Sequence, residues 1–173
     1  MRAVQDLKIS VAEILGRPGL FQDVKLSPRI DGVATTLARL EEAPLDATLR
    51  AESVVEGILV TGSVSGGELL ECARCLKELR SQVNVEVCEL FEAPGHESED
   101  DSYRVSGNEI DLEPMLRDNV TLALPLKPVC SEDCKGLCAT CGTDLNVGSC
   151  DCTEEVVDER WAPLSALKEK LQT

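Results

Sequence analysis

The stretch LDATLRAESVVEGILVTGSVSGGELLECARC, residues 45–75, decides the fold because a strand pattern runs directly into a pair of metal-ligand residues. Apolar and polar residues alternate over 49–55 and again over 58–64. Alternation with a period of two is typical of a strand with one buried face. The Ser-Gly-Gly sequence at 65–67 predicts a turn, and a short strand then leads into Cys72.

The segments on either side extend this pattern to an antiparallel meander of three or four strands. A second alternation over 83–87 predicts the strand that follows the CxxC sequence. Toward the N-terminus, Ser10 and Glu13 form a capping box, which predicts a short helix over 10–15. Residues 20–45 are interrupted by Pro28, Gly32 and Pro44, and their pattern predicts no more than one strand.

Downstream of the meander, the sequence predicts a loop, a helix and a cysteine block. Residues 94–108 are acidic and lack periodicity, which indicates a surface loop. Over 112–124, apolar residues recur at helical spacing after a suitable N-cap at Asp111, and Pro125 ends the helix. A last short helix is expected over 163–171.

These elements predict an α+β fold: an antiparallel β-meander with a packed helix and a C-terminal zinc-ribbon-like cysteine module. We expect an α+β core domain over 1–127 that includes the acidic loop 94–108. A cysteine-rich metal-binding module is expected over 128–152, and an acidic link with a C-terminal helix over 153–173.

Composition narrows the possible functions. The chain has 173 residues, a formal charge of −15 and only 2% aromatic residues. Nucleic-acid binders need clustered cations, and single-stranded readers usually stack bases on exposed rings. An acidic chain is better matched to a basic partner, such as a ribosomal protein. No stretch resembles a membrane span or a secretory signal, so we expect a cytoplasmic protein that takes no membrane partner.

The nine cysteines favour metal binding over disulfides, because cytosolic thiols are kept reduced. Two CxxC units, Cys72 with Cys75 and Cys138 with Cys141, are the usual halves of tetrahedral four-cysteine sites. Cys88 lies on a predicted strand away from both units, and we expect it to be a buried apolar thiol. Eight candidate metal ligands remain: Cys72, Cys75, Cys130, Cys134, Cys138, Cys141, Cys150 and Cys152. Two zinc ions are expected, with iron as the less common occupant.

The eight cysteines divide in two possible ways. In the first, the last four cysteines close a local site over 138–152, and the remaining four join 72–75 to 130–134. In the second, the two CxxC units share one ion. We favour the first division because a local site costs little chain entropy to close.

The sequence favours a non-enzymatic protein. A catalytic zinc site keeps an open position and usually has His or carboxylate ligands, whereas the single histidine, His96, lies in the acidic loop. No phosphate-binding loop is present, so no small-molecule substrate is expected. A small basic cluster around the first CxxC unit, formed by Arg74, Lys77 and Arg80, is a candidate contact for RNA or a protein partner. Lys127 and Lys135 extend the cluster if Cys130 and Cys134 pack against this unit.

Four segments together resemble the YceD family in its actinobacterial and Gram-positive form: GELLECARCL (67–76), DLEPMLRDNVTLALPLKPVC (111–130), CKGLCATCGTDLNVGSCDC (134–152) and DERWAPLSAL (158–167). The resemblance implies a cytoplasmic bacterial protein that supports the accumulation of large-subunit (23S) ribosomal RNA and has no known enzymatic activity. The factor would bind precursor RNA directly or hold a basic ribosomal protein. A zinc- and thiol-based redox sensor is the alternative from a different functional class.

Overall fold

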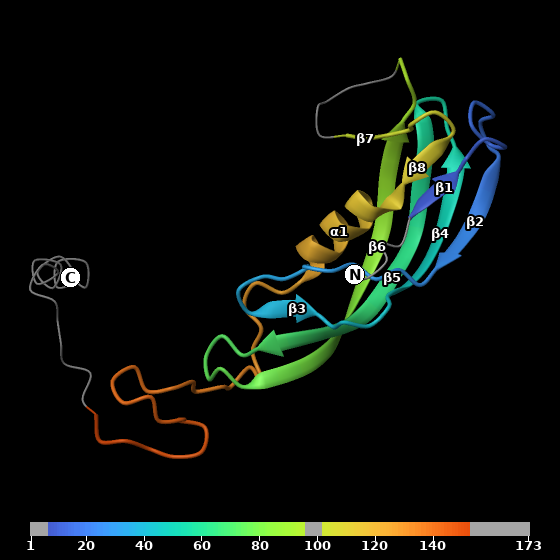
Figure 1. Ribbon diagram of the computed structural model, residues 1–173. Helices are drawn as coiled ribbons and strands as arrows, with labels where there is room; N and C mark the ends of the chain where they lie inside the picture. Colours follow the sequence, from blue (N-terminus) through green and yellow to red (C-terminus); the bar gives the residue numbers. More distant parts are fainter. Residues whose placement is uncertain (1–6, 96–101, 153–173) are drawn as a thin grey trace, which may run out of the picture.

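The structure is a computed structural model that describes residues 7–95 and 102–152, and its core is a strongly curved β-sheet with a helix across one face (Figure 1). The six-stranded sheet has the order β2-β4-β5-β6-β7, with β3 paired to the far end of β5. A second sheet pairs β1 with β8. The strands are β1 (Lys8–Ser10), β2 (Phe21–Leu26), β3 (Ala38–Leu40), β4 (Asp46–Ser53), β5 (Gly57–Glu71), β6 (Glu78–Glu92), β7 (Tyr103–Arg104) and β8 (Glu109–Asp111).

The predicted meander is confirmed over β4, β5 and β6, which follow one another as antiparallel neighbours. Its inner face carries the side chains that the alternation selected, such as Leu49, Val60 and Val85, and all three are buried. Because neighbours along each strand point to opposite faces, the polar residues between them reach the surface. The sheet is mixed rather than purely antiparallel, since β7 joins β6 in parallel.

The turn predicted at 65–67 is wrong, because β5 runs through it without interruption. A Cβ atom on Gly66 would lie 2.3 Å from Leu45 Cδ2, and one on Gly67 would lie 2.5 Å from Glu41 Oε2. The two glycines therefore give room to side chains that pack against both faces of a long strand, which is a common role of glycine within a strand.

Three shorter segments also differ from the expectations. The helix predicted over 10–15 is only a turn, in which the N–H groups of Ile14 and Leu15 donate to the Val11 carbonyl. Residues 20–45 contain two strands rather than one, β2 and β3. The predicted loop over 94–108 includes β7, so it is not irregular throughout. The helix predicted over 163–171 lies outside the described residues.

Cys88 was expected to be buried, and the structure shows it exposed. Val83, Val85 and Val87 on the same strand are buried, so the even-numbered Cys88 must point to the opposite face. The strand alternation, read strictly, places this thiol outside the core.

The predicted helix is confirmed as α1 (Leu112–Ala123). The Asp111 carboxylate accepts a hydrogen bond from the Glu113 N–H at 3.0 Å, as an N-cap should. The buried face of α1 consists of Leu112, Met115, Leu116 and Val120, which join the sheet in one aliphatic core. Asn119 Nδ2 also donates to Glu89 Oε1 at 3.0 Å, which fixes the helix beside β6.

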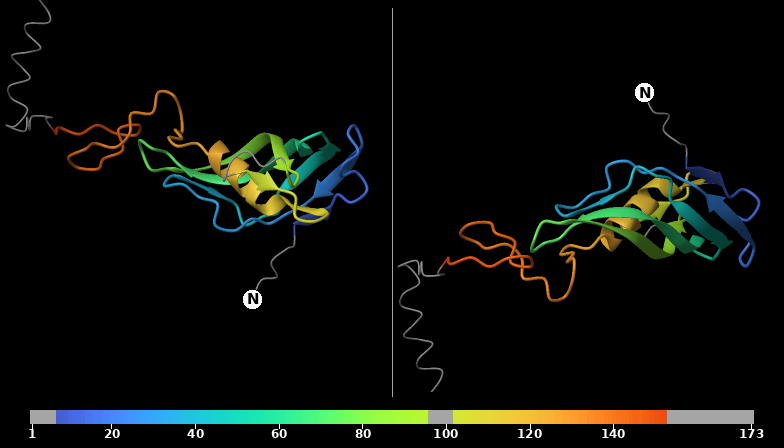
Figure 2. Two further views of the ribbon diagram at one scale, coloured as in Figure 1. Left: turned by 90° about the horizontal axis from the view of Figure 1, so that it is seen from above. Right: turned by 90° about the horizontal axis from the view of Figure 1, so that it is seen from below.

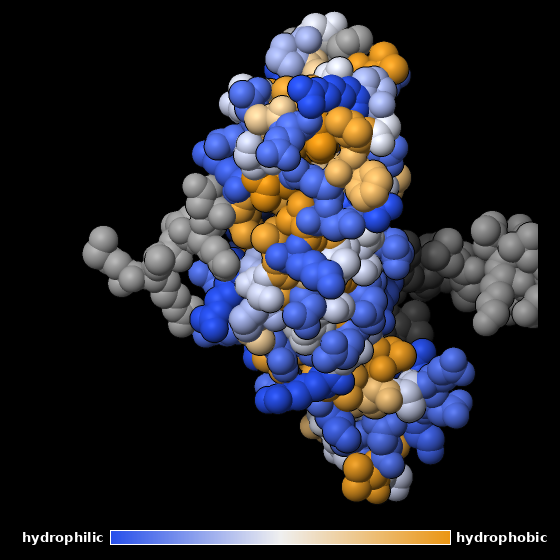
Figure 3. Space-filling model, turned by 90° about the vertical axis from the view of Figure 1, so that its right-hand side faces the viewer, coloured by the Kyte–Doolittle hydropathy of each residue, from blue (hydrophilic) through white to orange (hydrophobic). Residues whose placement is uncertain are grey.

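The long β5–β6 hairpin projects beyond the body formed by the sheet and α1, and the cysteine segment continues from its tip (Figure 2). Seen from the β2 side, hydrophilic residues dominate the surface, and the apolar residues that reach it form separate groups (Figure 3). Within the described residues, no helix combines the length and apolar character that crossing a membrane requires.

Candidate metal centres

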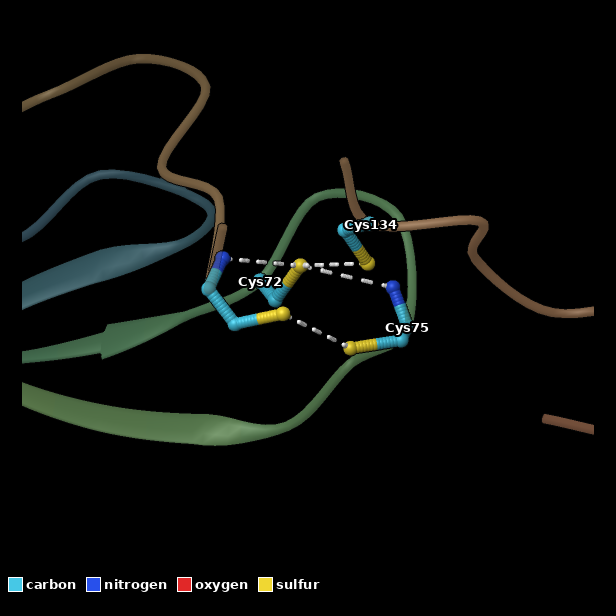
Figure 4. Close-up of side chains that lie close together, drawn as sticks. Cys72, Cys75 and Cys134 are labelled. Atoms are coloured by element: carbon cyan, nitrogen blue, oxygen red, sulfur yellow. Dashed lines mark hydrogen bonds between the residues drawn. The ribbon is translucent and has the colours of Figure 1, made fainter. Parts of the chain in front are cut away.

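The turn between β5 and β6 has the shape of a metal-binding knuckle. The Cys72 N–H donates to the Lys77 carbonyl at 2.9 Å, and the Leu76 N–H donates to the Cys72 carbonyl at 2.9 Å. Leu76 has a φ of 60°, a left-handed conformation that is uncommon for a branched side chain. This tight turn brings the sulfurs of Cys72 and Cys75 to the same side (Figure 4).

The chain that follows α1 is fastened to this knuckle through the backbone. The Ala73 N–H donates to the Pro128 carbonyl at 2.8 Å. The Cys130 N–H points at Cys72 Sγ, with a separation of 3.4 Å. Two parts of the chain about sixty residues apart are thereby held side by side.

Arg74 completes this attachment. Its Nη1 donates to the carbonyls of Glu132 at 2.9 Å and Cys134 at 2.8 Å, and its own carbonyl accepts from the Leu137 N–H at 3.1 Å. Gly136 packs against the same residue, because a Cβ atom there would lie 3.0 Å from the Arg74 carbonyl oxygen. The arginine therefore holds residues 132–137 in place.

Four sulfurs meet at this point, and we call the set the hairpin tetrad: Cys72, Cys75, Cys130 and Cys134. Their ligand atoms lie within 4.8 Å of one another, with 3.9 Å between Cys72 Sγ and Cys134 Sγ and 3.7 Å between Cys75 Sγ and Cys130 Sγ. A tetrahedral zinc ion with Zn–S bonds of about 2.3 Å holds neighbouring sulfurs about 3.8 Å apart. The donor set therefore fits zinc in both chemistry and size.

The second CxxC unit repeats the knuckle. The Cys138 N–H donates to the Thr143 carbonyl at 2.9 Å, and the Gly142 N–H donates to the Cys138 carbonyl at 2.9 Å. Gly142 has a φ of 73° at the position that corresponds to Leu76. Glycine adopts this conformation at little cost, so the second knuckle forms without the steric penalty of the first.

The second set of sulfurs, which we call the local tetrad, consists of Cys138, Cys141, Cys150 and Cys152. Its ligand atoms also lie within 4.8 Å of one another. Within the described part of the chain, both sets contain only cysteine ligands. His96 lies outside the described residues. The structure groups the sulfurs as the first of the two divisions does, while their role as metal ligands stays a prediction.

Asn146 connects the two tetrads, and nothing in the sequence pattern singled it out. Its Oδ1 accepts from the Lys135 N–H at 2.8 Å, and its Nδ2 lies 3.5 Å from Cys134 Sγ. The Asp144 carboxylate in turn accepts from the Asn146 N–H at 2.9 Å. The loop of the local tetrad thus supports a sulfur of the hairpin tetrad. Only its place between two cysteine units, within a turn-forming sequence, hinted at this role.

The electrostatics of the hairpin tetrad suit a cation. The N–H of Cys75, followed by those of Arg74 and Cys130, donates to Cys72 Sγ and lowers the pKa of this thiol to about 6. At Cys75 the Lys77 N–H acts in the same direction, but burial and the neighbouring thiols outweigh it and raise the pKa to about 12. One thiolate forms readily and makes the next harder to form, a conflict that a bound divalent cation removes.

The local tetrad has the same arrangement. Hydrogen bonds from the hydroxyl and then the N–H of Thr143 lower the pKa of Cys141 to about 6. The thiol of Cys152 is hydrogen-bonded to Cys141 and partly desolvated, which together raise its pKa to about 12. Hydrogen bonds from the N–H groups of Cys141 and Thr140 also lower the pKa of Cys138, so each tetrad contains at least one thiol that deprotonates readily and can bind a metal ion.

The predicted basic cluster is only partly available for a partner. Arg74 is hydrogen-bonded within the hairpin tetrad, and Arg80 lies 3.9 Å from the Glu41 carboxylate. Lys77, Lys127 and Lys135 are exposed. The packing of Cys130 and Cys134 against the knuckle brings the segment that carries Lys127 and Lys135 to the hairpin tip.

Comparison with known proteins identifies the family. Residues 60–168 match the sequence model described as large ribosomal RNA subunit accumulation protein YceD. An uncharacterized protein of Mycobacterium tuberculosis is 41% identical over 166 residues, which cover 91% of this chain and 79% of the relative. The chain belongs to the YceD family. The match covers most of β5, all of β6 and α1, and both tetrads, and so includes every candidate metal ligand.

Two further relatives are similar to this chain over shorter stretches. The Bacillus subtilis protein YlbN is 28% identical over 128 residues, which cover 72% of this chain and 74% of that protein. A chloroplastic protein of Arabidopsis thaliana, named large ribosomal RNA subunit accumulation protein YCED homolog 1, is 41% identical over 64 residues. That alignment covers 37% of this chain and 20% of the plant protein. No solved structure matches this chain.

Proposed function

We propose that this protein is a non-enzymatic, cytoplasmic factor that supports the accumulation of large-subunit ribosomal RNA. The observation that carries the proposal is the match over residues 60–168 to a family described by that role. The factor would act through RNA or through a basic ribosomal protein. The formal charge of −15 supports the second route, because phosphate backbones repel an acidic surface.

Both tetrads would hold zinc for structural reasons. Four sulfur donors fill the tetrahedral coordination of zinc and leave no open position for a substrate or a reactive water molecule. The residues around the sulfurs donate hydrogen bonds or hold loops, as Arg74 and Asn146 do. The two sites would therefore have a structural role. They would hold the hairpin tip in one conformation.

The test is genetic. Deletion of the gene is expected to lower the ratio of large- to small-subunit ribosomal RNA, and the wild-type gene should restore it. A Cys72→Ser variant should fail to restore the ratio because the hairpin tetrad cannot close. Cys88→Ser is the matched control and should restore it fully. An unchanged ratio after deletion would contradict the proposed function.

A further inference from the structure

Among residues 7–95 and 102–152, the outer edge of β6 is open for most of its length. On one side β6 pairs with β5 along all fifteen residues, and on the other its pairing within these ranges is with β7, at Phe91 and Glu92. Among the described residues, the outer backbone edge from 78 to 90 makes no other hydrogen bond. The edge is about 40 Å long at roughly 3.3 Å per residue.

The hydrogen-bonding register identifies which backbone groups face this edge. The Ala93 N–H donates to the Glu56 carbonyl, and the Cys72 N–H donates to the Lys77 carbonyl. In an antiparallel pair, bonded and non-bonded positions alternate, so odd-numbered residues of β6 bond to β5. Even-numbered residues, including Gln82, Asn84 and Glu86, therefore present N–H and C=O groups outward. The Glu92 carbonyl, which accepts from the Val105 N–H on the β7 side, agrees with this assignment.

The edge lacks two of the usual protections, although charged side chains such as Glu78, Glu86 and Glu89 are present on β6. Natural edge strands are commonly blocked by proline, charged side chains, a bulge or a covering segment. The sequence of β6 contains no proline, and its pairing with β5 continues without a bulge. The side chains of Ser81, Gln82 and Asn84 are exposed. β7 demonstrates that the outer edge accepts a strand.

Exposed apolar side chains lie on the end of α1 and on the link that follows it, and α1 packs against β6. Asn119 of α1 contacts Glu89 of β6, and Leu122 lies three residues later on the same side of the helix. Leu122 is 86% exposed, and Leu126, in the link from α1 to the hairpin tip, is 79% exposed. Figure 1 shows this link running from the end of α1 toward the tip. A strand added to β6 would bury apolar surface here as well as backbone.

The charge along the outer edge of β6 indicates which class of molecule binds there. The exposed carboxylates of Glu78 and Glu86 have no cationic partner among the described residues, and Arg80 is already beside Glu41. A second copy of the chain would bring another formal charge of −15, and RNA would bring phosphates. A segment rich in Lys or Arg matches the charge, and only a polypeptide matches the row of backbone groups.

We propose that the open edge of β6, over residues 79–89, binds an extended basic segment of a ribosomal protein as an additional β-strand. This inference rests on the proposed function and names the class of partner. Main-chain hydrogen bonds to the even-numbered residues would supply the affinity. Glu78, Glu86 and the apolar surface at Leu122 would select basic segments with interspersed apolar residues.

Amide hydrogen exchange, measured residue by residue, tests the geometry. In the free protein, the N–H groups of Gln82, Asn84 and Glu86 should exchange rapidly, while those of Val83, Val85 and Val87 should be protected. The probes are the large-subunit ribosomal proteins of the same organism, purified singly and added in turn. At least one should protect the even-numbered amides. The proposal is overturned if none does.

A proline substitution tests the binding mode. Asn84→Pro removes one outward N–H but no bond to β5, so it should lower the affinity for that ribosomal protein about tenfold or more. Asn84→Ala keeps the N–H and should change the affinity less than about twofold. Gln82→Pro is the second variant, for use if Asn84→Pro does not fold with full metal content. Binding that survives both proline variants overturns the proposal.

Two other occupants would give recognisable results, and either would overturn the proposal. Protection that rises with protein concentration alone would indicate a second copy, and protection by a large-subunit RNA fragment would indicate RNA. In cells, Asn84→Pro should reproduce the effect of gene deletion on ribosomal RNA. Full restoration by Asn84→Pro would reject the docking edge alone, whereas an unaffected deletion strain would reject the proposed function itself.

Discussion

The two tetrads share one knuckle geometry but differ in where their ligands come from. The hairpin tetrad joins residues that lie 55 to 62 positions apart, and its Cys72 and Cys134 are 0% and 4% exposed. The local tetrad takes all its ligands from 138–152, and Cys141 and Cys152 are exposed. The hairpin tetrad is part of the architecture, because together with the hydrogen bonds of Ala73 and Arg74 it fastens the chain after α1 to the hairpin. The local tetrad fixes the conformation of a loop that is attached to the hairpin tetrad.

Breaking the hairpin tetrad should have the largest effect. Cys72→Ser removes the central sulfur, and we expect loss of one metal ion per chain. The free energy of unfolding should fall by more than about 3 kcal/mol, because binding of a structural zinc is itself folding free energy. Limited proteolysis should then cut between residues 124 and 137. Wild-type resistance to proteolysis, despite the lost metal, would show that the hairpin tetrad does not hold residues 124–137 against the hairpin.

Breaking the local tetrad should leave the body intact. Cys152→Ser is expected to remove one metal ion while the melting temperature of the sheet core changes by less than about 2 °C, since surface changes remote from the core have small effects. Cys88→Ser, outside both tetrads, should keep both ions and serves as the control. A large fall in the melting temperature of Cys152→Ser would mean that the two regions are not separable.

The link between the tetrads is Asn146. Asn146→Ala removes hydrogen bonds to the Lys135 N–H and to Cys134 Sγ, and should destabilise the hairpin tetrad by about 1–2 kcal/mol. The measurement is the rate of metal release to a chelator, which should rise several-fold. Asn84→Ala removes an exposed asparagine elsewhere and should release metal at the wild-type rate. Equal rates for the two variants would show that the tetrads are independent.

The smallest changes in stability are expected from substitutions at the left-handed residues of the two knuckles, Leu76 and Gly142. Leu76→Gly relieves a left-handed leucine but makes the unfolded chain more flexible, so a net gain in stability of about 0.5–1 kcal/mol is expected. Gly142→Ala should lose about 1 kcal/mol for the converse reason. Urea unfolding measures both changes. A loss of stability in Leu76→Gly would mean that the side chain makes contacts that outweigh the strain.

The sequence predicted the features that depend on local patterns. Helix α1, with its Asp111 cap, and the alternating strands follow from side-chain periodicity, which reports burial directly. The grouping of the cysteines followed from loop entropy, which favours the local set. Short strands such as β3 and β7 have two or three residues and carry too little pattern to be recognised.

Other features were missed because they depend on distant contacts. Gly66 and Gly67 looked like a turn, but their purpose is to admit Leu45 and Glu41 from another part of the chain. Arg74 looked like a candidate partner contact, but its hydrogen bonds reach residues 58 and 60 positions away. The exposure of Cys88 does not depend on distant contacts. Strict use of the strand alternation would have placed this residue at the surface.

We propose that both tetrads are closed zinc sites with four sulfur ligands each. The most direct test combines metal analysis with zinc X-ray absorption spectroscopy on full-length protein, purified without chelator or reductant. Two closed sites predict two zinc ions per chain, each surrounded by four sulfur atoms at about 2.3 Å. Fewer than two ions, or nitrogen and oxygen atoms bound to zinc, would contradict it.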